Sequence, residues 1–214
     1  MFDNETIVSY IYNSNRLDGV SVTEDQTRAI LQGSLTQEMI KGDDGREFER
    51  EVVSGHDRAL RGMFTMSQDA APLALNSICN LHKALMGELL LSAGEFRECI
   101  LKYKGLLIAS PPQHLNERVE WLVNLTNSGL ERAQDVHKFS WRVHHEFITL
   151  HPFIEGNGRI ARLLLNLVRL RRGLDLSIIE FGAREQYSKA IIEFQQQKIR
   201  RAQQKASSGG NPTL

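Results

Sequence analysis

Apolar residues recur at steps of three and four along most of the chain, the spacing that places them on one side of an α-helix. The pattern is clearest in residues 75–89, LNSICNLHKALMGEL, and in residues 131–150. Because the same spacing continues elsewhere, most of the chain is expected to be helical. The expected helices cover residues 1–16, a segment that begins after Ser21 or Thr23, residues 50–65, 75–89, a segment from about 114, and residues 131–150.

Three segments depart from this pattern. Residues 37–50 have little apolar content and two glycines, so a surface loop is expected there. Residues 205–214 are polar and contain Gly, Ser and Pro, which predicts a disordered tail. In residues 94–115, two short β-prone arms lie on either side of Gly105 and two prolines close the segment, a pattern typical of a β-hairpin. The predicted class is all-α with one small β-hairpin.

Composition and charge are those of an ordinary globular protein, with 41% hydrophobic and 24% charged residues among 214. Lys+Arg and Asp+Glu balance at 26 each, so no overall charge favours nucleic acid or an anionic membrane as a partner. The chain lacks a run of about 18 apolar residues, which argues against a spanning helix. Its first residues lack the basic and apolar pattern of a secretory signal. A cytoplasmic protein is therefore expected.

Candidate chemistry is concentrated in twelve residues that begin at His151, HPFIEGNGRIAR. The apolar stripe of the preceding helix carries His151 toward the interior, and Pro152 disfavours helical geometry at His151 and ends that helix. An isolated histidine is more often a packed core residue than a catalyst. The other six histidines fit that interpretation: His56, His82, His114, His137, His144 and His145.

Gly156, Asn157 and Gly158 form a turn that can bring backbone N–H groups close to a ligand. A helix that begins near Arg159 points its positive end at the same place, which favours an anion. Arg159 and Arg162 lie on one face of its first turn, and guanidinium groups suit phosphate oxygens because they stay charged and bind two at a time.

Glu155 lies beside this turn and offers a carboxylate to a divalent cation. Mg²⁺ prefers such sites when substrate phosphates supply other ligands. The alternative is an ordinary loop-to-helix turn in which Glu155 pairs with an arginine at the surface. Spacing alone leaves both interpretations open.

The same residues resemble a known family. HPFIEGNGRIAR agrees at every specified position with HPFx[DE]GNGRxxR, the signature of the Fic (filamentation induced by cAMP) domain. The resemblance extends over roughly residues 10–195 and implies a helical bundle with a β-hairpin flap. It divides the chain into an N-terminal segment over residues 1–25, a catalytic domain over 26–204 and the tail over 205–214.

The resemblance implies a protein adenylyltransferase, which moves AMP from ATP to a Tyr, Thr or Ser hydroxyl of a target protein or of itself. The related Doc toxins, which transfer the γ-phosphate, have a lysine where this chain has Gly158, so Gly158 favours nucleotidyl transfer. Two alternatives stay open: a transferase that uses another nucleotide-linked donor, and a non-catalytic module that binds a nucleotide or a partner. A homo-oligomer contact also stays open.

The resemblance also implies a role for each site residue. His151 would be the general base, and Glu155 would hold Mg²⁺ or Mn²⁺. Tyr187 would contact the nucleotide, the alternative being a core tyrosine. The expected nucleotide-binding residues are Gly156, Asn157, Gly158, Arg159, Arg162 and Tyr187. The flap would dock the target as an added strand, and its expected docking residues are Leu101, Lys102, Tyr103, Lys104, Gly105, Leu106, Leu107 and Ile108.

The N-terminal stretch SNRLDG resembles the family's inhibitory motif, [ST]xxxE[GN]. Ser14 and Gly19 match the motif, whereas Asp18 stands where glutamate is expected. In the family that glutamate pairs with the second signature arginine, here Arg162, and blocks productive placement of the γ-phosphate. Because aspartate is shorter by roughly 1.5 Å, the expected inhibition is partial. The alternative is a turn aspartate before Gly19.

Overall fold

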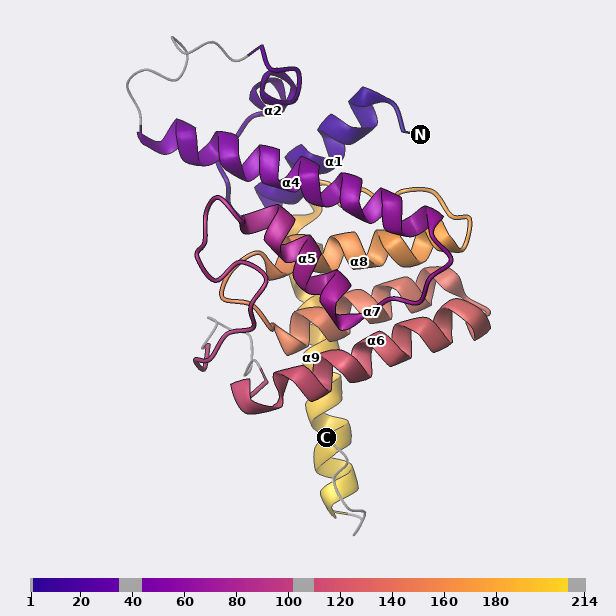
Figure 1. Ribbon diagram of the computed structural model, residues 1–214. Helices are drawn as coiled ribbons and strands as arrows, with labels where there is room; N and C mark the ends of the chain where they lie inside the picture. The colour runs from indigo at the N-terminus through magenta and orange to yellow at the C-terminus, as the bar shows by residue number, and fades with distance from the viewer. Residues whose placement is uncertain (1, 35–43, 102–109, 208–214) are drawn as a thin grey trace.

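A computed structural model describes residues 2–34, 44–101 and 110–207 of the chain. All of the regular elements in these ranges are helical (Figure 1). They are α1 (Asn4–Leu17), α2 (Glu24–Leu31), α4 (Asp44–Gln68), α5 (Leu75–Met86), α6 (Leu115–Arg132), α7 (Val136–Leu150), α8 (Asn157–Arg171) and α9 (Arg184–Ser207), with short 3-10 helices η1 (Pro112–His114) and η2 (Phe181–Ala183).

The predicted helices are confirmed, except that α5 ends at Met86 and not at residue 89, and that α7 begins at Val136 and not at residue 131. Several helix ends have local causes. Asp3 caps α1 by accepting a hydrogen bond from the backbone N–H of Thr6. Thr23 caps α2 in a reciprocal capping box with Gln26, which decides between the two caps expected for that helix. Asp135 caps α7.

The loop predicted over residues 37–50 is wrong from residue 44 onward, because α4 begins at Asp44. The packed face of this helix lies farther along and includes the buried Val52, Val53 and Leu60. Once a helix is nucleated by such packing, adding each further residue costs little, and a glycine reduces stability by only about 1 kcal/mol. The poor apolar pattern near its start therefore does not stop α4.

The predicted β-hairpin is not found in the described residues. Residues 94–101 form turns and irregular chain, while the predicted docking residues Lys102, Tyr103, Lys104, Gly105, Leu106, Leu107 and Ile108 lie outside the described residues. Near the two ends of that gap, the carbonyls of Cys99 and Ser110 accept hydrogen bonds from the side chain of Arg97. Both of these carbonyls therefore already accept a hydrogen bond from a side chain.

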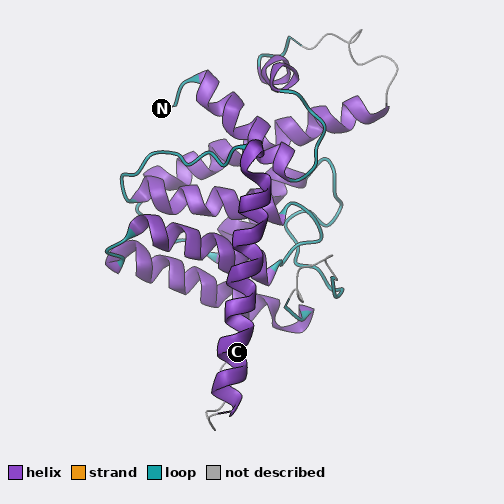
Figure 2. Ribbon diagram, turned by 180° about the vertical axis from the view of Figure 1, so that it is seen from behind, coloured by secondary structure: helices purple, strands orange, loops and turns teal. Residues whose placement is uncertain are grey.

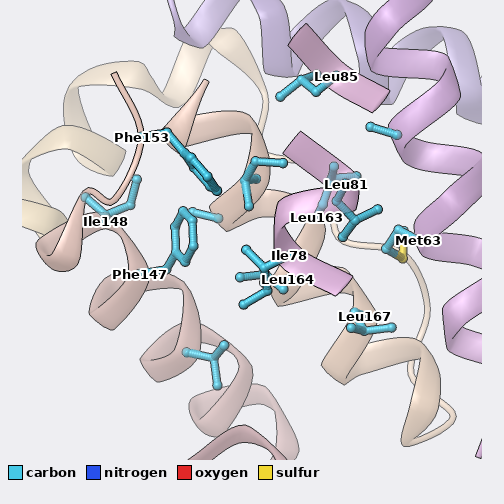
Figure 3. Packing of buried hydrophobic residues seen from close by; sticks show 14 of the residues in the cluster. Met63, Ile78, Leu81, Leu85, Phe147, Ile148, Phe153, Leu163, Leu164 and Leu167 are labelled. Carbon is cyan, nitrogen blue, oxygen red and sulfur yellow. The ribbon is translucent and has the colours of Figure 1, made fainter. Parts of the chain in front are cut away.

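Helix α8 forms the centre of the bundle and packs against α7 and α4 (Figure 1). Ten of its residues in an unbroken run, from Arg159 to Val168, are buried, which is typical of a helix enclosed on all sides. Figure 3 shows Phe147 of α7 and Phe153 of the following loop next to side chains from α5 and α8, and both phenylalanines are fully buried. The core side chains therefore pack against the connection between α7 and α8 and support it.

The helices near the two ends of the chain, α1 and α9, pack against α8 and α7 respectively. Helix α1 contacts α8, α4 and η2, while α9 contacts α7 and crosses the bundle on the face seen in Figure 2. Among the described residues, none of the helices has both the length and the apolar character needed to cross a membrane.

Replacing Leu167 by alanine should lower the free energy of unfolding by about 2–5 kcal/mol, because its side chain is fully buried in α8 and the change leaves a cavity. Urea denaturation would measure the loss. The control is Ile199→Ala on α9, where the side chain is 36% exposed and the expected change is below about 1 kcal/mol. Equal losses in the two variants would contradict this account of the core.

Candidate functional site

His151 lies at the C-terminal end of α7 with a left-handed backbone, φ 47° and ψ 59°. Its N–H still donates to the carbonyl of Phe147 at 2.9 Å, and the helix ends at Leu150, before Pro152, as the sequence predicts. The side chain is half-buried. Burial lowers the pKa of His151 to about 4, although a hydrogen bond with the backbone of Ile148 raises it. The imidazole is therefore neutral at pH 7, the form that can accept a proton.

The loop from His151 to α8 is held by the side chain of Asn157. Its Oδ1 accepts from the backbone N–H of Phe153 at 3.0 Å, and its Nδ2 donates to the carbonyl of Phe153 at 2.8 Å. Because Phe153 is itself buried in the core, this pair of bonds fixes the loop to the core. The side chain of Asn157 thus organises the loop, which leaves its backbone N–H as the group that can face a ligand.

Helix α8 starts at Asn157, two residues before the predicted start, with Gly156 as its N-cap at φ 76°. A Cβ at Gly156 would lie 3.2 Å from atoms of Leu85 and Met86, so only glycine fits without strain. None of the described side chains caps this helix end. Its first N–H groups and the positive end of its dipole are therefore available to an anion.

The two signature arginines are buried beside this helix end. Arg162 donates from Nε to Ser14 Oγ at 2.7 Å and from Nη2 to Asp18 Oδ1 at 2.8 Å. Arg159 Nε lies 3.3 Å from Asp18 Oδ2, so one carboxylate meets both guanidinium groups. Burial opposes the charge on Arg162, but Asp18 outweighs it and the pKa of Arg162 is raised.

Asp18 therefore reaches Arg162 in spite of its short side chain. It is the C-cap of α1 and is followed by Gly19 at φ 93°. Asn15 Oδ1, one turn earlier, lies 2.9 Å from Nδ1 of His56 on α4, which fixes the end of α1. The position of the helix thus makes up for the missing methylene group.

The carboxylate of Asp18 lies over the turn at the start of α8. A Cβ built on Gly158 would be 2.6 Å from Asp18 Oδ1 and 3.1 Å from Arg162 Nη1. Glycine at this position therefore leaves just enough space for one anionic group between the turn and the two arginines. Arg159 Nη1 is buried and has no hydrogen-bond partner among the described residues.

Tyr187 on α9 contacts the guanidinium group of Arg162. Its hydroxyl lies 3.2 Å from Arg162 Nη1 and 2.8 Å from His144 Nε2. Burial lowers the pKa of His144 well below its ordinary value, so this ring is neutral and can accept from the tyrosine. Tyr187 is half-buried and links α7 to α8.

Glu155 is exposed, and its backbone carbonyl lies 3.0 Å from Nε2 of His82. Nδ1 of His82 accepts from the N–H of Gly94 at 2.8 Å, so Nε2 carries the proton and donates to Glu155. The ring also stacks on Phe153, with centroids 3.7 Å apart. The core interpretation of His82 is correct, but the sequence carries no signal for this link because His82 lies on an ordinary apolar stripe.

The described residues contain no cluster of three or more His, Cys, Asp or Glu side chains able to hold a metal ion. Glu155 offers a single exposed carboxylate close to the anion-binding turn. This fits a cation that takes its remaining ligands from substrate phosphates and water.

The chain is similar to several known proteins. Residues 72–168 match the model of the Fic/DOC family. The segment that holds the site is therefore similar to this family. The chain is 31% identical over 186 residues to "Protein adenylyltransferase fic-1" of Caenorhabditis briggsae, and the aligned region covers 86% of this chain and 36% of that protein. It is 29% identical over 188 residues to "Protein adenylyltransferase Fic" of Nematostella vectensis, covering 86% of this chain and 42% of that protein. The chain thus spans less than half the length of these relatives.

The fold of the chain is similar to those of solved structures, among them the following two. One is a Fic domain containing signaling protein from Bacteroides thetaiotaomicron, with a TM-score of 0.78 and 25% identity over 88% of this chain and 72% of that chain. The other is Fic-1 from C. elegans, with a TM-score of 0.77 and 29% identity over 88% of this chain and 55% of that chain.

Burial makes the stability of the chain sensitive to mild acid. Burial is the largest cause of a lowered pKa at five histidines: His56, His82, His144, His145 and His151. For His145 burial is the cause, and it lowers the pKa to about 4 from the ordinary 6.5. Below pH 6.5 the unfolded chain binds protons at these rings and the folded chain does not.

We expect the urea midpoint to fall as the pH is lowered from 6.5 to about 4. His145→Asn should reduce this fall because it removes one of the groups that only the unfolded chain protonates. His114→Asn is the control, since that side chain is exposed. A urea midpoint that stays constant across this range would contradict the assignment of neutral, buried histidines.

Proposed function

We propose that the chain is a protein adenylyltransferase that transfers AMP from ATP to a Tyr, Thr or Ser hydroxyl of a protein, and that Asp18 partly inhibits it. The proposal rests on one observation. The short segment from His151 to Arg162 brings together a neutral imidazole, an uncapped helix N-terminus and two buried arginines. Residues 26–204 would form the catalytic domain and residues 1–25 a regulatory segment.

The reaction needs a base on one side of the α-phosphorus and an anion site on the other. The acceptor hydroxyl oxygen bonds to the α-phosphorus, and its proton passes to the neutral imidazole of His151. The bond from the α-phosphorus to the oxygen bridging to the β-phosphate breaks, and pyrophosphate leaves. The proton on His151 is then released to water.

The leaving group is held by the first turn of α8. Backbone N–H groups of Gly156, Asn157 and Gly158, with Arg159 and Arg162, would bind the β- and γ-phosphates. The unpartnered Nη1 of Arg159 supports this role, because a buried guanidinium donor without a partner suits an incoming phosphate oxygen. Tyr187 would act here through its bond to Arg162.

Glu155 would hold Mg²⁺ or Mn²⁺, which supplies positive charge to the phosphate oxygens when bound. The exposed carboxylate supports this role, and the bond from His82 to the carbonyl of Glu155 orients the backbone that carries it.

Asp18 competes for the same cations. Its carboxylate contacts Arg159 and Arg162 and lies over Gly158, where a phosphate group would bring its own negative charge. Two like charges cannot share this small space, so ATP binds productively only when Asp18 moves away. Since the Asp18 side chain is 24% exposed and is held by one helix end, the inhibition is partial.

Asp18→Ala should raise self-AMPylation by about tenfold or more, since it frees both arginines for the phosphates. Labelling with α-³²P-ATP and Mg²⁺ gives the rate, and the intact mass identifies the adduct. The matched control is Asp25→Ala, which removes an exposed aspartate paired with Arg28 at 2.9 Å. If Asp18→Ala labels no faster than the unmodified chain, the inhibitory role is wrong.

His151→Ala in the Asp18→Ala background should lower the labelling rate by about 10²–10⁴-fold, the usual contribution of a general base. ATP affinity should stay within about twofold, because His151 is separate from the phosphate-binding turn. Replacing the exposed His114 in the same background is the control.

The same measurements separate the other two functions. A mass matching UMP or CMP, with no AMP, would indicate a different nucleotide-linked donor. Nucleotide binding without any adduct, unchanged by His151→Ala, would indicate a non-catalytic binding module.

A further inference from the structure

Arg97 is a buried arginine whose charge has no carboxylate partner among the described residues. Its exposed fraction is 3%. All of its side-chain hydrogen bonds go to backbone carbonyls: Nε donates to His151 at 2.7 Å, Nη1 to Cys99 at 2.6 Å, and Nη2 to Ser110 and, at 3.5 Å, to Leu150. Its own backbone N–H donates to the carbonyl of Pro152 at 2.9 Å.

These carbonyls come from two separate parts of the chain. Leu150, His151 and Pro152 form the C-terminal end of α7 and the start of the site loop. Cys99 and Ser110 lie on either side of residues 102–109. A single guanidinium group therefore joins the backbone of the proposed base to two other points of the chain, and its charge meets the negative end of the α7 dipole.

The backbone that Arg97 holds is a strained one. His151 is the only non-glycine residue of the described chain with a positive φ. Such a conformation costs about 1–3 kcal/mol and persists only where its surroundings hold it. Bonds from Arg97 to the carbonyls of His151 and Leu150, on both sides of the bend, provide that support.

We propose that Arg97 is a positioning residue: its planar guanidinium holds the backbone of His151 in the left-handed conformation and anchors it to Cys99 and Ser110. This inference rests on the proposed function, in which His151 is the base. Arg97 makes no hydrogen bond to Arg159, Arg162 or the first turn of α8. It therefore affects the proton-transfer step and leaves the binding of the phosphates unchanged.

The chain contains a matched arginine for comparison. Arg172 also donates to three backbone carbonyls at the end of a helix: Nη1 to Leu130 at 2.9 Å and Gly129 at 3.3 Å, and Nη2 to Ala133 at 3.0 Å. These carbonyls lie at the end of α6, next to the start of α7, whereas His151 lies at the opposite end of α7. Removing Arg172 breaks bonds of the same kind without changing the base.

The test compares Arg97→Met, Arg97→Lys and Arg172→Met in the Asp18→Ala background. Three quantities are measured for each: the maximal self-AMPylation rate, the ATP concentration at half-maximal rate, and Tm. Arg97→Met should lower the maximal rate by about tenfold or more and change the half-saturating ATP concentration by less than about twofold. Arg172→Met should lower Tm and leave both kinetic quantities unchanged.

Lysine keeps the charge but replaces the planar fork by one ammonium group, which cannot meet the same carbonyls in the same geometry. Arg97→Lys should therefore lower the maximal rate by about threefold or more and leave the half-saturating ATP concentration nearly unchanged. This variant carries the test if Arg97→Met does not fold.

Three results would count against this role. If the Asp18→Ala parent forms no adduct, the proposed function fails and this role fails with it. If the parent is labelled and both Arg97 variants keep its rate, the positioning role alone is wrong. The role is also wrong if ATP saturation weakens as much as the rate falls, because a general structural defect then explains the loss.

Discussion

The pairing of the buried Arg162 with Asp18 is the interaction on which the site depends. A guanidinium group enclosed in the centre of the bundle requires partners, and Arg162 finds them on α1, through Ser14 and Asp18, and on α9, through Tyr187. The ends of the chain are thereby fixed to the central helix. The same positive charge is the one that a nucleotide would need. In the proposed function, inhibition and phosphate binding would therefore share one cation, and freeing Arg162 for a phosphate would mean giving up its bond to Asp18.

The site itself is built where the C-terminal end of α7 connects to the N-terminal end of α8, its neighbour in the bundle. The end of α7 presents carbonyls and the proposed base, while the start of α8 presents N–H groups. Each end is stabilised by its own partner: Arg97 meets the carbonyls of α7, and Asn157 closes the loop before α8. His82 supports the same loop from α5 through the carbonyl of Glu155. These supports lie outside the signature except for Asn157, and they explain how a six-residue connection can hold a strained histidine next to an anion-binding turn.

Helical periodicity predicts most of the fold because helix formation follows the local spacing of apolar residues. It fails at residues 44–50, where packing of the later part of α4 extends a helix into a segment with few apolar residues. The β-hairpin predicted over residues 94–115 is not found in the described part of that segment. Residues 94–101 form turns and irregular chain, and the side chain of Arg97 binds the carbonyl of Cys99, a contact that β-propensity alone does not report. His82 and His144 are buried as expected, yet their bonds to Glu155 and Tyr187 connect elements far apart in the sequence.

The sequence by itself determined which groups share the segment from His151 to Arg162, because a histidine, two glycines and two arginines at that spacing lie together through local geometry. It also determined that Asp18 is one methylene shorter than the glutamate expected there. Only the tertiary structure decided that Asp18 nevertheless reaches Arg162, 144 residues away, at 2.8 Å. The reach of a side chain across a protein depends on where packing places the two helices, and here the end of α1 lies close enough to α8 for an aspartate to suffice.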